Sequence, residues 1–247
     1  CLIEVFQWLH RHPELAMEER KTTAFIRNIL AENGVRLLET GLETGVIAAL
    51  GKGEGPTVAL RADIDGLPVC EQTGLAYVSG RPGVMHACGH DFHAACMLGA
   101  ALLLKAREAE LPGTVKVIFQ PAEEVNRGAA LMVATGLLDD VRLFLAGHTY
   151  PWYEAGILGV RPGPMMASAD RFSAKLTGKG CHAANPERGI DPVPALAAIV
   201  TAAQSIVSGN RKIALAQKAC PYEHALLHTQ QGLAAVSSCQ FLHRQAA

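Results

Sequence analysis

The chain has 247 residues, of which 49% are hydrophobic and 18% are charged. This composition is typical of a folded protein with a buried core and excludes a disordered chain. The formal net charge of −1 excludes a strongly basic nucleic-acid-binding protein, and no apolar run reaches the roughly 18–20 residues that cross a bilayer.

The number and spacing of the cysteines indicate whether the protein occupies a reducing or an oxidising compartment. The chain has 7 Cys, an odd number, and they show no paired spacing. The N-terminus has no basic stretch followed by an apolar one, so no signal peptide is predicted. We therefore predict a reduced, cytoplasmic protein with a small-molecule partner, and no nucleic-acid or membrane partner.

Helix-like and strand-like segments alternate in the first part of the chain. Residues 3–10 and 21–31 have the apolar spacing of amphipathic helices. Short apolar runs predict buried strands at 46–50, 58–60, 115–119 and 141–145. Asp91 stands at the N-cap position of an Ala- and Leu-rich helix over 92–106. This alternation predicts a layered α/β fold.

A second, smaller unit follows a Gly/Pro-rich stretch at 159–164. Residues 170–176 alternate like a half-buried strand, and 191–207 form an Ala-rich helix, which together predict an α+β unit. Residues 211–247 have no clean period. We predict three parts: a catalytic metal-binding domain over 1–165, a partial second domain over 166–210, and an atypical tail over 211–247.

Ligand-type side chains recur where the predicted strands end. Asp63 and Asp65 follow the second strand, Glu123 and Glu124 follow the third, and His148 follows the fourth. The carboxyl edge of an open α/β sheet is where ligands bind. We therefore expect these residues to meet at one edge.

The segment MHACGHD places Cys88 between His86 and His90 at two-residue spacing. In an extended backbone these three side chains point to one side. Thiolate and imidazole together suit zinc, cobalt, nickel or manganese, although a buried thiol and a turn-capping histidine are equally open. We expect His93 to face the helix interior or solvent.

The carboxylates have simpler explanations as well. Pro121 is expected to open a helix with Glu123 and Glu124 in its first turn, where acids favour the helix dipole. If a metal lies nearby, one of the two binds it and the other takes a proton from water. Asp63 and Asp65 are candidates as ligands, as partners that orient a histidine, or as turn formers, and orienting is favoured for Asp65.

The chain resembles the peptidase family M20 amidohydrolases, and most closely their N-acyl-amino-acid amidohydrolase branch, which includes hippurate and auxin-conjugate hydrolases. The resemblance covers roughly residues 1–210. It rests on RADIDGLP, GVMHACGHDFHAACMLGAA, VIFQPAEE, AGH and LTGKGCHAANPERGIDP, in that order. It implies a layered mixed-sheet, metallopeptidase-like catalytic domain with an inserted lid/dimerisation domain.

The resemblance also implies roles. Cys88 would bridge two divalent cations, and His90, Glu124 and His148 would be further metal ligands. Glu123 would be the general base, Asp65 would orient a neighbouring ligand, and His182 would stabilise the oxyanion in the partner's site of a homodimer. The substrate class would be N-acyl amino acids, with Mn, Zn, Co and Ni all compatible.

The chain also departs from the family pattern. Glu187 stands where many relatives have His, and Cys181 where they commonly have Gly or Ser. No family motif is recognised from residue 211 onward, so His224, His228 and His243 are left unassigned and the chain is expected to be truncated or altered at its C-terminus.

The sequence leaves three alternatives to a metal-dependent hydrolase. The first is a catalytically incompetent fragment of the same fold, or a dimerising or binding piece. A structural zinc site is disfavoured because CxxC-type pairs are absent from the sequence. A cysteine nucleophile at Cys88 is disfavoured because the sequence gives it no oriented base.

Overall fold

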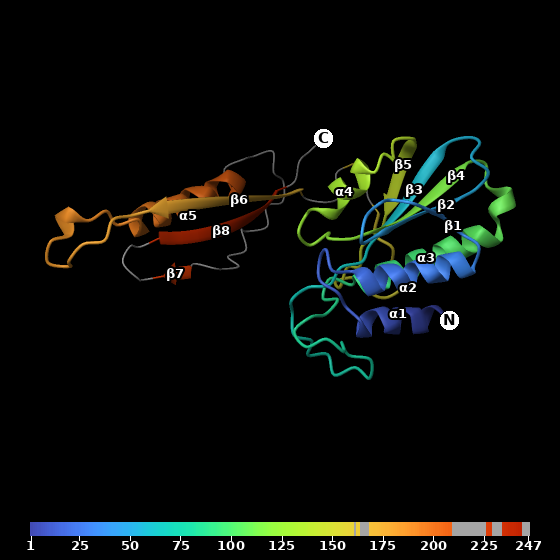
Figure 1. The fold of residues 1–247 in the computed structure, drawn as a ribbon, viewed down its shortest axis with the longest axis horizontal. Helices are drawn as coiled ribbons and strands as arrows, with labels where there is room; N and C mark the ends of the chain where they lie inside the picture. The colour runs from blue at the N-terminus through green and yellow to red at the C-terminus, as the bar shows by residue number, and fades with distance from the viewer. Residues whose placement is uncertain (161, 164–167, 209–225, 229–233, 244–247) are drawn as a thin grey trace. The chain divides into compact units, whose positions relative to one another are not determined.

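The computed structural model describes residues 1–160, 162–163, 168–208, 226–228 and 234–243, and the chain divides into two compact units, residues 1–154 and 155–247 (Figure 1). Residues 211–225, 229–233 and 244–247 of the predicted tail, His224 among them, lie outside the described residues. The predicted division at residues 165 and 210 stays a prediction.

A mixed five-stranded sheet forms the centre of the first unit, in the order β1-β2-β4-β3-β5. Its strands are β1 (Arg36–Leu38), β2 (Val46–Leu50), β3 (Thr57–Asp63), β4 (Thr114–Gln120) and β5 (Val141–Ala146). β3 runs parallel to both β4 and β5, whereas β1 and β2 are antiparallel to their neighbours. The carboxyl ends of β3, β4 and β5 therefore meet at one edge. The predicted layered α/β class and its four strands are confirmed. The prediction that the strand at 141–145 is buried was wrong, because β5 is the edge strand of the described sheet and its residues 142–146 are exposed.

Helices cover both faces of this sheet (Figure 1). One face packs against α2 (Arg20–Glu32) and α3 (His90–Ala106), with α1 (Leu2–Arg11) packed on α3, and the other face packs against the region of α4 (Gly128–Ala134). Alternate residues of a strand point to opposite faces. Accordingly Val117 and Phe119 of β4 join the first core cluster, while Ile118 joins the second.

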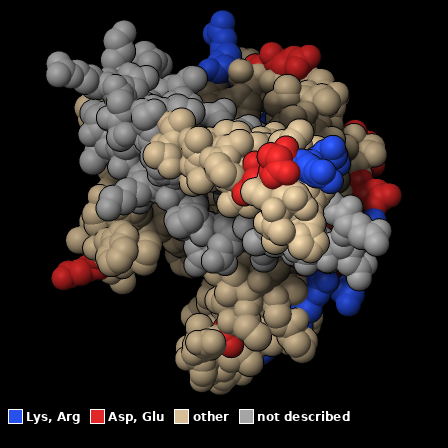
Figure 2. Space-filling model, turned by 90° about the vertical axis from the view of Figure 1, so that its left-hand side faces the viewer, with Lys and Arg blue, Asp and Glu red and all other residues tan. Residues whose placement is uncertain are grey.

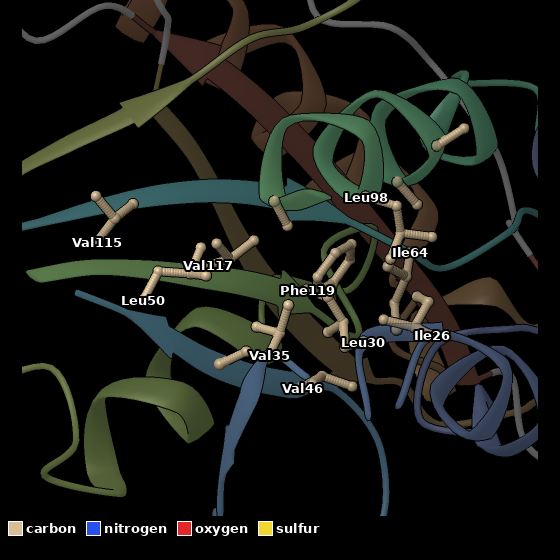
Figure 3. Packing of buried hydrophobic residues seen from close by; sticks show 14 of the residues in the cluster. Ile26, Leu30, Val35, Val46, Leu50, Ile64, Leu98, Val115, Val117 and Phe119 are labelled. Atoms are coloured by element: carbon tan, nitrogen blue, oxygen red, sulfur yellow. The ribbon is translucent and has the colours of Figure 1, made fainter. Parts of the chain in front are cut away.

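Figure 3 shows the larger core cluster, in which side chains from strands and helices interlock. Phe119, Leu98, Ile26 and Leu30 are all fully buried there. Truncating such a side chain to alanine typically costs about 2–5 kcal/mol. This core fixes α3, and with it the start of that helix, against the sheet.

The start of α3 differs from the prediction. Its N-cap is Gly89 rather than Asp91, and Gly89 has a φ of 82°, in the left-handed region that glycine adopts without a Cβ clash. Asp91 lies inside the first turn, where its Oδ2 pairs with Nδ1 of His10 at 2.6 Å. The N-cap prediction for Asp91 was wrong because a tertiary contact engages its carboxylate.

The second unit contains a three-stranded antiparallel sheet in the order β6-β8-β7. Its elements are β6 (Ser168–Thr177), η2 (Pro186–Arg188), α5 (Val193–Ser208), β7 (Leu226–His228) and β8 (Ala234–His243). The predicted strand at 170–176 and helix at 191–207 are confirmed as β6 and α5.

The surface carries charges of both signs. On the face drawn in Figure 2, the acidic and basic side chains of the described residues are scattered and interspersed. In the described part of the chain, no helix is long and apolar enough to span a membrane. The cytoplasmic location stays a prediction.

Candidate metal centre

Four segments meet at the carboxyl edge of the first unit's sheet. They are the end of β3, the turn after β4, the segment after β5, and the start of α3. Together they bring seven ligand-type side chains into one cluster, namely Asp63, Cys88, His90, His93, Glu123, Glu124 and His148. The meeting of these segments, expected from parallel pairing, is what the structure shows.

His90 belongs to three groups of potential ligands. In the first, one donor atom each from Cys88, His90 and His148 lie within 4.8 Å of one another. In the second, donor atoms of His90, Glu123 and Glu124 meet the same limit. The third group joins His90 to Asp63 and His93. All three groups share His90, so their donor atoms surround one region of the site.

The ring of His90 is fully buried, and its two nitrogens differ. Nδ1 lies 3.1 Å from Oδ1 of Asp65, to which it donates. Nε2 has no hydrogen-bond partner, and it lies 3.8 Å from Oε1 of Glu124, which also has none. Leaving buried polar atoms unpaired is costly, and a cation between these two atoms would satisfy both.

The electrostatics of the cluster favour a bound cation. Burial lowers the pKa of His90, but the bond to Asp65, the nearby Cys88 thiol and the charges of Asp63 and Asp65 raise it to about 11. Burial and the neighbouring carboxylates Glu123 and Asp65 raise the pKa of Glu124. The site thus stabilises positive charge, and a cation would relieve the repulsion among its carboxylates.

Cys88 and His148 face each other across the cluster. Sγ of Cys88 lies 3.5 Å from Nε2 of His148. Nδ1 of His148 donates to the backbone carbonyl of Thr149 at 2.7 Å, which leaves the Nε2 lone pair free. A metal-binding histidine ordinarily has its second ring nitrogen held by such a partner.

Glu123 and Glu124 lie in a turn and not in a helix, because α4 begins only at Gly128. The prediction that they lie in the first turn of a helix was therefore wrong. Ala122 before them has a φ of 50°, and its N–H donates to Oε1 of buried Glu19 at 2.7 Å. The N–H of Glu124 donates to Oδ2 of Asp65 at 3.0 Å. These two contacts hold the turn against the site.

Comparison with known proteins agrees with this geometry. The model of peptidase family M20/M25/M40 matches residues 59–241. The chain belongs to this family. The matched range continues past residue 210, into the segment where no motif was recognised from the sequence.

Three relatives of this M20 chain are informative. It is 48% identical over 210 residues to an N-acetyl-L-cysteine deacetylase of Bacillus subtilis, covering 85% of this chain and 50% of the relative. It is 41% identical over 210 residues to an N-acyl-L-amino acid amidohydrolase of Geobacillus stearothermophilus, covering 83% and 57%. A crystal structure of a dinuclear metal-binding M20 peptidase from Bacillus subtilis superposes with a TM-score of 0.74 at 39% identity, covering 100% of this chain and 64% of that one. The chain thus spans about half the length of the curated relatives.

Two histidines of the M20 chain lie differently from the prediction. The backbone from His86 to His90 is not extended, since a turn precedes α3. His86 is buried outside the ligand group that contains Cys88, and burial lowers the pKa of His86 to about 4.

His93, expected to face the helix interior or solvent, instead lies at the site, with Nδ1 2.6 Å from Oδ1 of Asp63. Its spacing from His90, three positions along one helix, was the available signal.

His182 lies in the second unit. Its side chain is exposed, and its Nδ1 accepts the backbone N–H of Ala184 at 3.1 Å. Its role as an oxyanion-stabilising residue stays a prediction.

Proposed function

We propose that this M20 chain is a metal-dependent hydrolase that cleaves the amide bond of N-acyl amino acids. The observation that carries the proposal is the pair of unpaired buried atoms, Nε2 of His90 and Oε1 of Glu124, beside Cys88 and His148. A half-buried thiol, two imidazoles and a carboxylate together form a donor set for a transition-metal ion.

Two divalent ions are proposed to lie among these donor groups. Cys88, placed to serve both ions, and His90, Glu124 and His148 would be the residues of this chain that hold them. Mn, Zn, Co and Ni all suit such a set. When bound, the ions supply Lewis-acid polarisation of the amide carbonyl and a water of lowered pKa.

Glu123 is proposed as the general base. Its carboxylate is half-buried beside Glu124, and it belongs to the donor group of His90. It takes a proton from the attacking water as the new carbon–oxygen bond forms. It then gives that proton to the departing amine as the carbon–nitrogen bond breaks, which releases a carboxylic acid and an amino acid.

The second unit contributes His182 and the dimer contact in this proposal. An exposed histidine that donates from Nε2 can stabilise the oxyanion of the tetrahedral intermediate. Its exposed position is compatible with reaching a partner's site in a homodimer.

The substrate class follows from the relatives, which are named as an N-acetyl-L-cysteine deacetylase and an N-acyl-L-amino acid amidohydrolase. Similarity to these enzymes supports hydrolysis over the alternative, a catalytically incompetent fragment or a dimerising or binding piece.

The test is hydrolysis by the chain loaded with Mn²⁺ or Zn²⁺. The substrates are N-acetyl-L-cysteine, other N-acetyl amino acids and hippurate, with the free amino group as the readout. The matched control is Glu123→Gln, which keeps the shape of the side chain and loses the base. Hydrolysis by the wild type and none by Glu123→Gln supports the proposal. Metal binding without hydrolysis supports the alternative, and no metal binding overturns the proposed site.

A further inference from the structure

Thr149 connects two segments that carry proposed ligands. Its backbone N–H donates to Nε2 of His93 at 2.8 Å. Its hydroxyl Oγ1 lies 3.1 Å from the carbonyl oxygen of Cys88 and 3.2 Å from Nε2 of His93. Thr149 therefore joins the segment of His148 both to Cys88 and to helix α3.

The tautomer of His93 follows from these contacts. A neutral imidazole has one nitrogen that donates and one that accepts. Because Nε2 accepts the N–H of Thr149, the proton lies on Nδ1, which donates to Oδ1 of Asp63 at 2.6 Å. The hydroxyl of Thr149 therefore donates its hydrogen bond to the backbone carbonyl of Cys88. Both nitrogens of His93 have hydrogen-bond partners, so His93 positions other residues of the site and does not bind a metal ion.

Asp63 anchors this chain of contacts in the sheet. It is the last residue of β3 and is 1% exposed, and its Oδ2 accepts from Nη1 of Arg61 at 2.7 Å. Its other oxygen, Oδ1, accepts the Nδ1 proton of His93. Both oxygens of Asp63 are therefore engaged, and the contact with Oδ1 holds the proton of His93 on Nδ1.

We propose that Asp63, His93 and Thr149 form a hydrogen-bonded clamp that fixes the spacing between Cys88 and His148, with Thr149 as a positioning residue for the metal site. The inference rests on the proposed function, because it concerns the same ligands. Cys88 lies before α3 and His148 follows β5, so no shared element sets the 3.5 Å between Sγ and Nε2. The side chain of Thr149 supplies that connection.

The test compares Thr149→Val, which removes the hydroxyl at constant shape, with Thr149→Ser, which keeps it. Cobalt(II) is the probe. Its affinity is measured by competition with a chelator, and its thiolate charge-transfer absorption reports bonding to Cys88. Thr201→Val is the matched control, because the Thr201 hydroxyl contacts only the carbonyl of Ala197 on α5 among the interactions the structure gives it.

The expected result is a roughly 10- to 100-fold weaker cobalt affinity and a weaker thiolate band for Thr149→Val. Thr149→Ser and Thr201→Val should stay close to wild type. Equal affinity in Thr149→Val and wild type overturns the clamp and leaves the proposed function standing. A wild type that binds no cobalt overturns both.

A second measurement does not depend on any variant folding. In the metal-free wild-type chain, imidazole ¹⁵N shifts report which nitrogen of His93 carries the proton. The clamp requires the proton on Nδ1, and a proton on Nε2 overturns it.

Discussion

Asp65 holds two proposed ligands at once, because its Oδ1 lies 3.1 Å from Nδ1 of His90 and its Oδ2 accepts the N–H of Glu124 at 3.0 Å. Its side chain is fully buried in the pair with His90. By accepting from Nδ1, Asp65 leaves the lone pair of His90 on Nε2, the nitrogen that faces Glu124. A carboxylate in this position sets both the tautomer of one ligand and the backbone of another.

Asp65→Asn tests this double role. An amide has one oxygen, so it keeps one of the two contacts and turns an N–H₂ group toward the other donor. We expect metal affinity to fall by roughly 10- to 100-fold. Chelator competition measures the loss, and an unchanged affinity would show that Asp65 does not orient His90.

Glu123→Gln separates metal binding from hydrolysis. The variant keeps the size of the side chain but cannot accept the proton from water. We expect an unchanged metal content and a kcat lowered by roughly 10²- to 10⁴-fold. Metal analysis and an amine-release assay on the same sample check the two parts. A kcat near the wild-type value would assign the base elsewhere.

Gly89→Ala tests the start of α3. Gly89 has a φ of 82°, and a Cβ there would lie 2.7 Å from Oγ1 of Thr149. We expect the unfolding free energy to fall by about 1–3 kcal/mol, because a left-handed conformation strains any other residue. Urea unfolding measures the loss. Gly147→Ala is the matched control, since nothing lies within 4 Å of a Cβ at that position. Equal losses in the two variants would contradict the account.

His10 links α1 to α3 and to the loop that contains Glu71. Its Nδ1 lies 2.6 Å from Asp91, and its Nε2 lies 3.0 Å from Oε1 of Glu71. Burial lowers the pKa of His10, but these bonds and the two carboxylate charges outweigh burial and raise the pKa above its ordinary value of 6.5. The stabilisation is therefore complete below pH 6.5 and disappears as the pH rises through the raised folded-state pKa.

His10→Gln should accordingly lower the unfolding free energy more at about pH 6 than at about pH 9. Urea unfolding of both proteins at the two pH values measures the difference. His12→Gln, which removes an exposed histidine on the same segment, is the matched control. A loss from His10→Gln that is constant across this range would show that His10 is not charged in the folded protein.

Much of this fold was readable from apolar periodicity. The strands at 46–50 and 115–119 stand out because they are buried on both faces, and α2 because its apolar spacing is helical. The prediction that the ligand-bearing segments meet at one edge of the sheet followed from the parallel pairing of the strands. Short β1 (Arg36–Leu38) carries too few residues for a period and was not predicted.

The parts of the site that were missed depend on contacts distant in the sequence. From local sequence Asp91 is predicted to be an N-cap, but in the structure its carboxylate pairs with His10, 81 positions away in the sequence. His93 looks like an ordinary helix residue until Asp63 and Thr149 close around it. Glu19, which holds the turn before Glu123 and Glu124, gives no local signal at all. Local patterns place the ligands, whereas the groups that support them emerge only from packing.

Metal stoichiometry per chain tests the central claim most directly. The chain is stripped with a chelator, reloaded with Zn²⁺ or Mn²⁺, and compared with Cys88→Ala by elemental analysis. The account predicts two tightly bound ions in the wild type and the loss of tight binding in the variant. No bound ion, or the same content in Cys88→Ala as in the wild type, would contradict it.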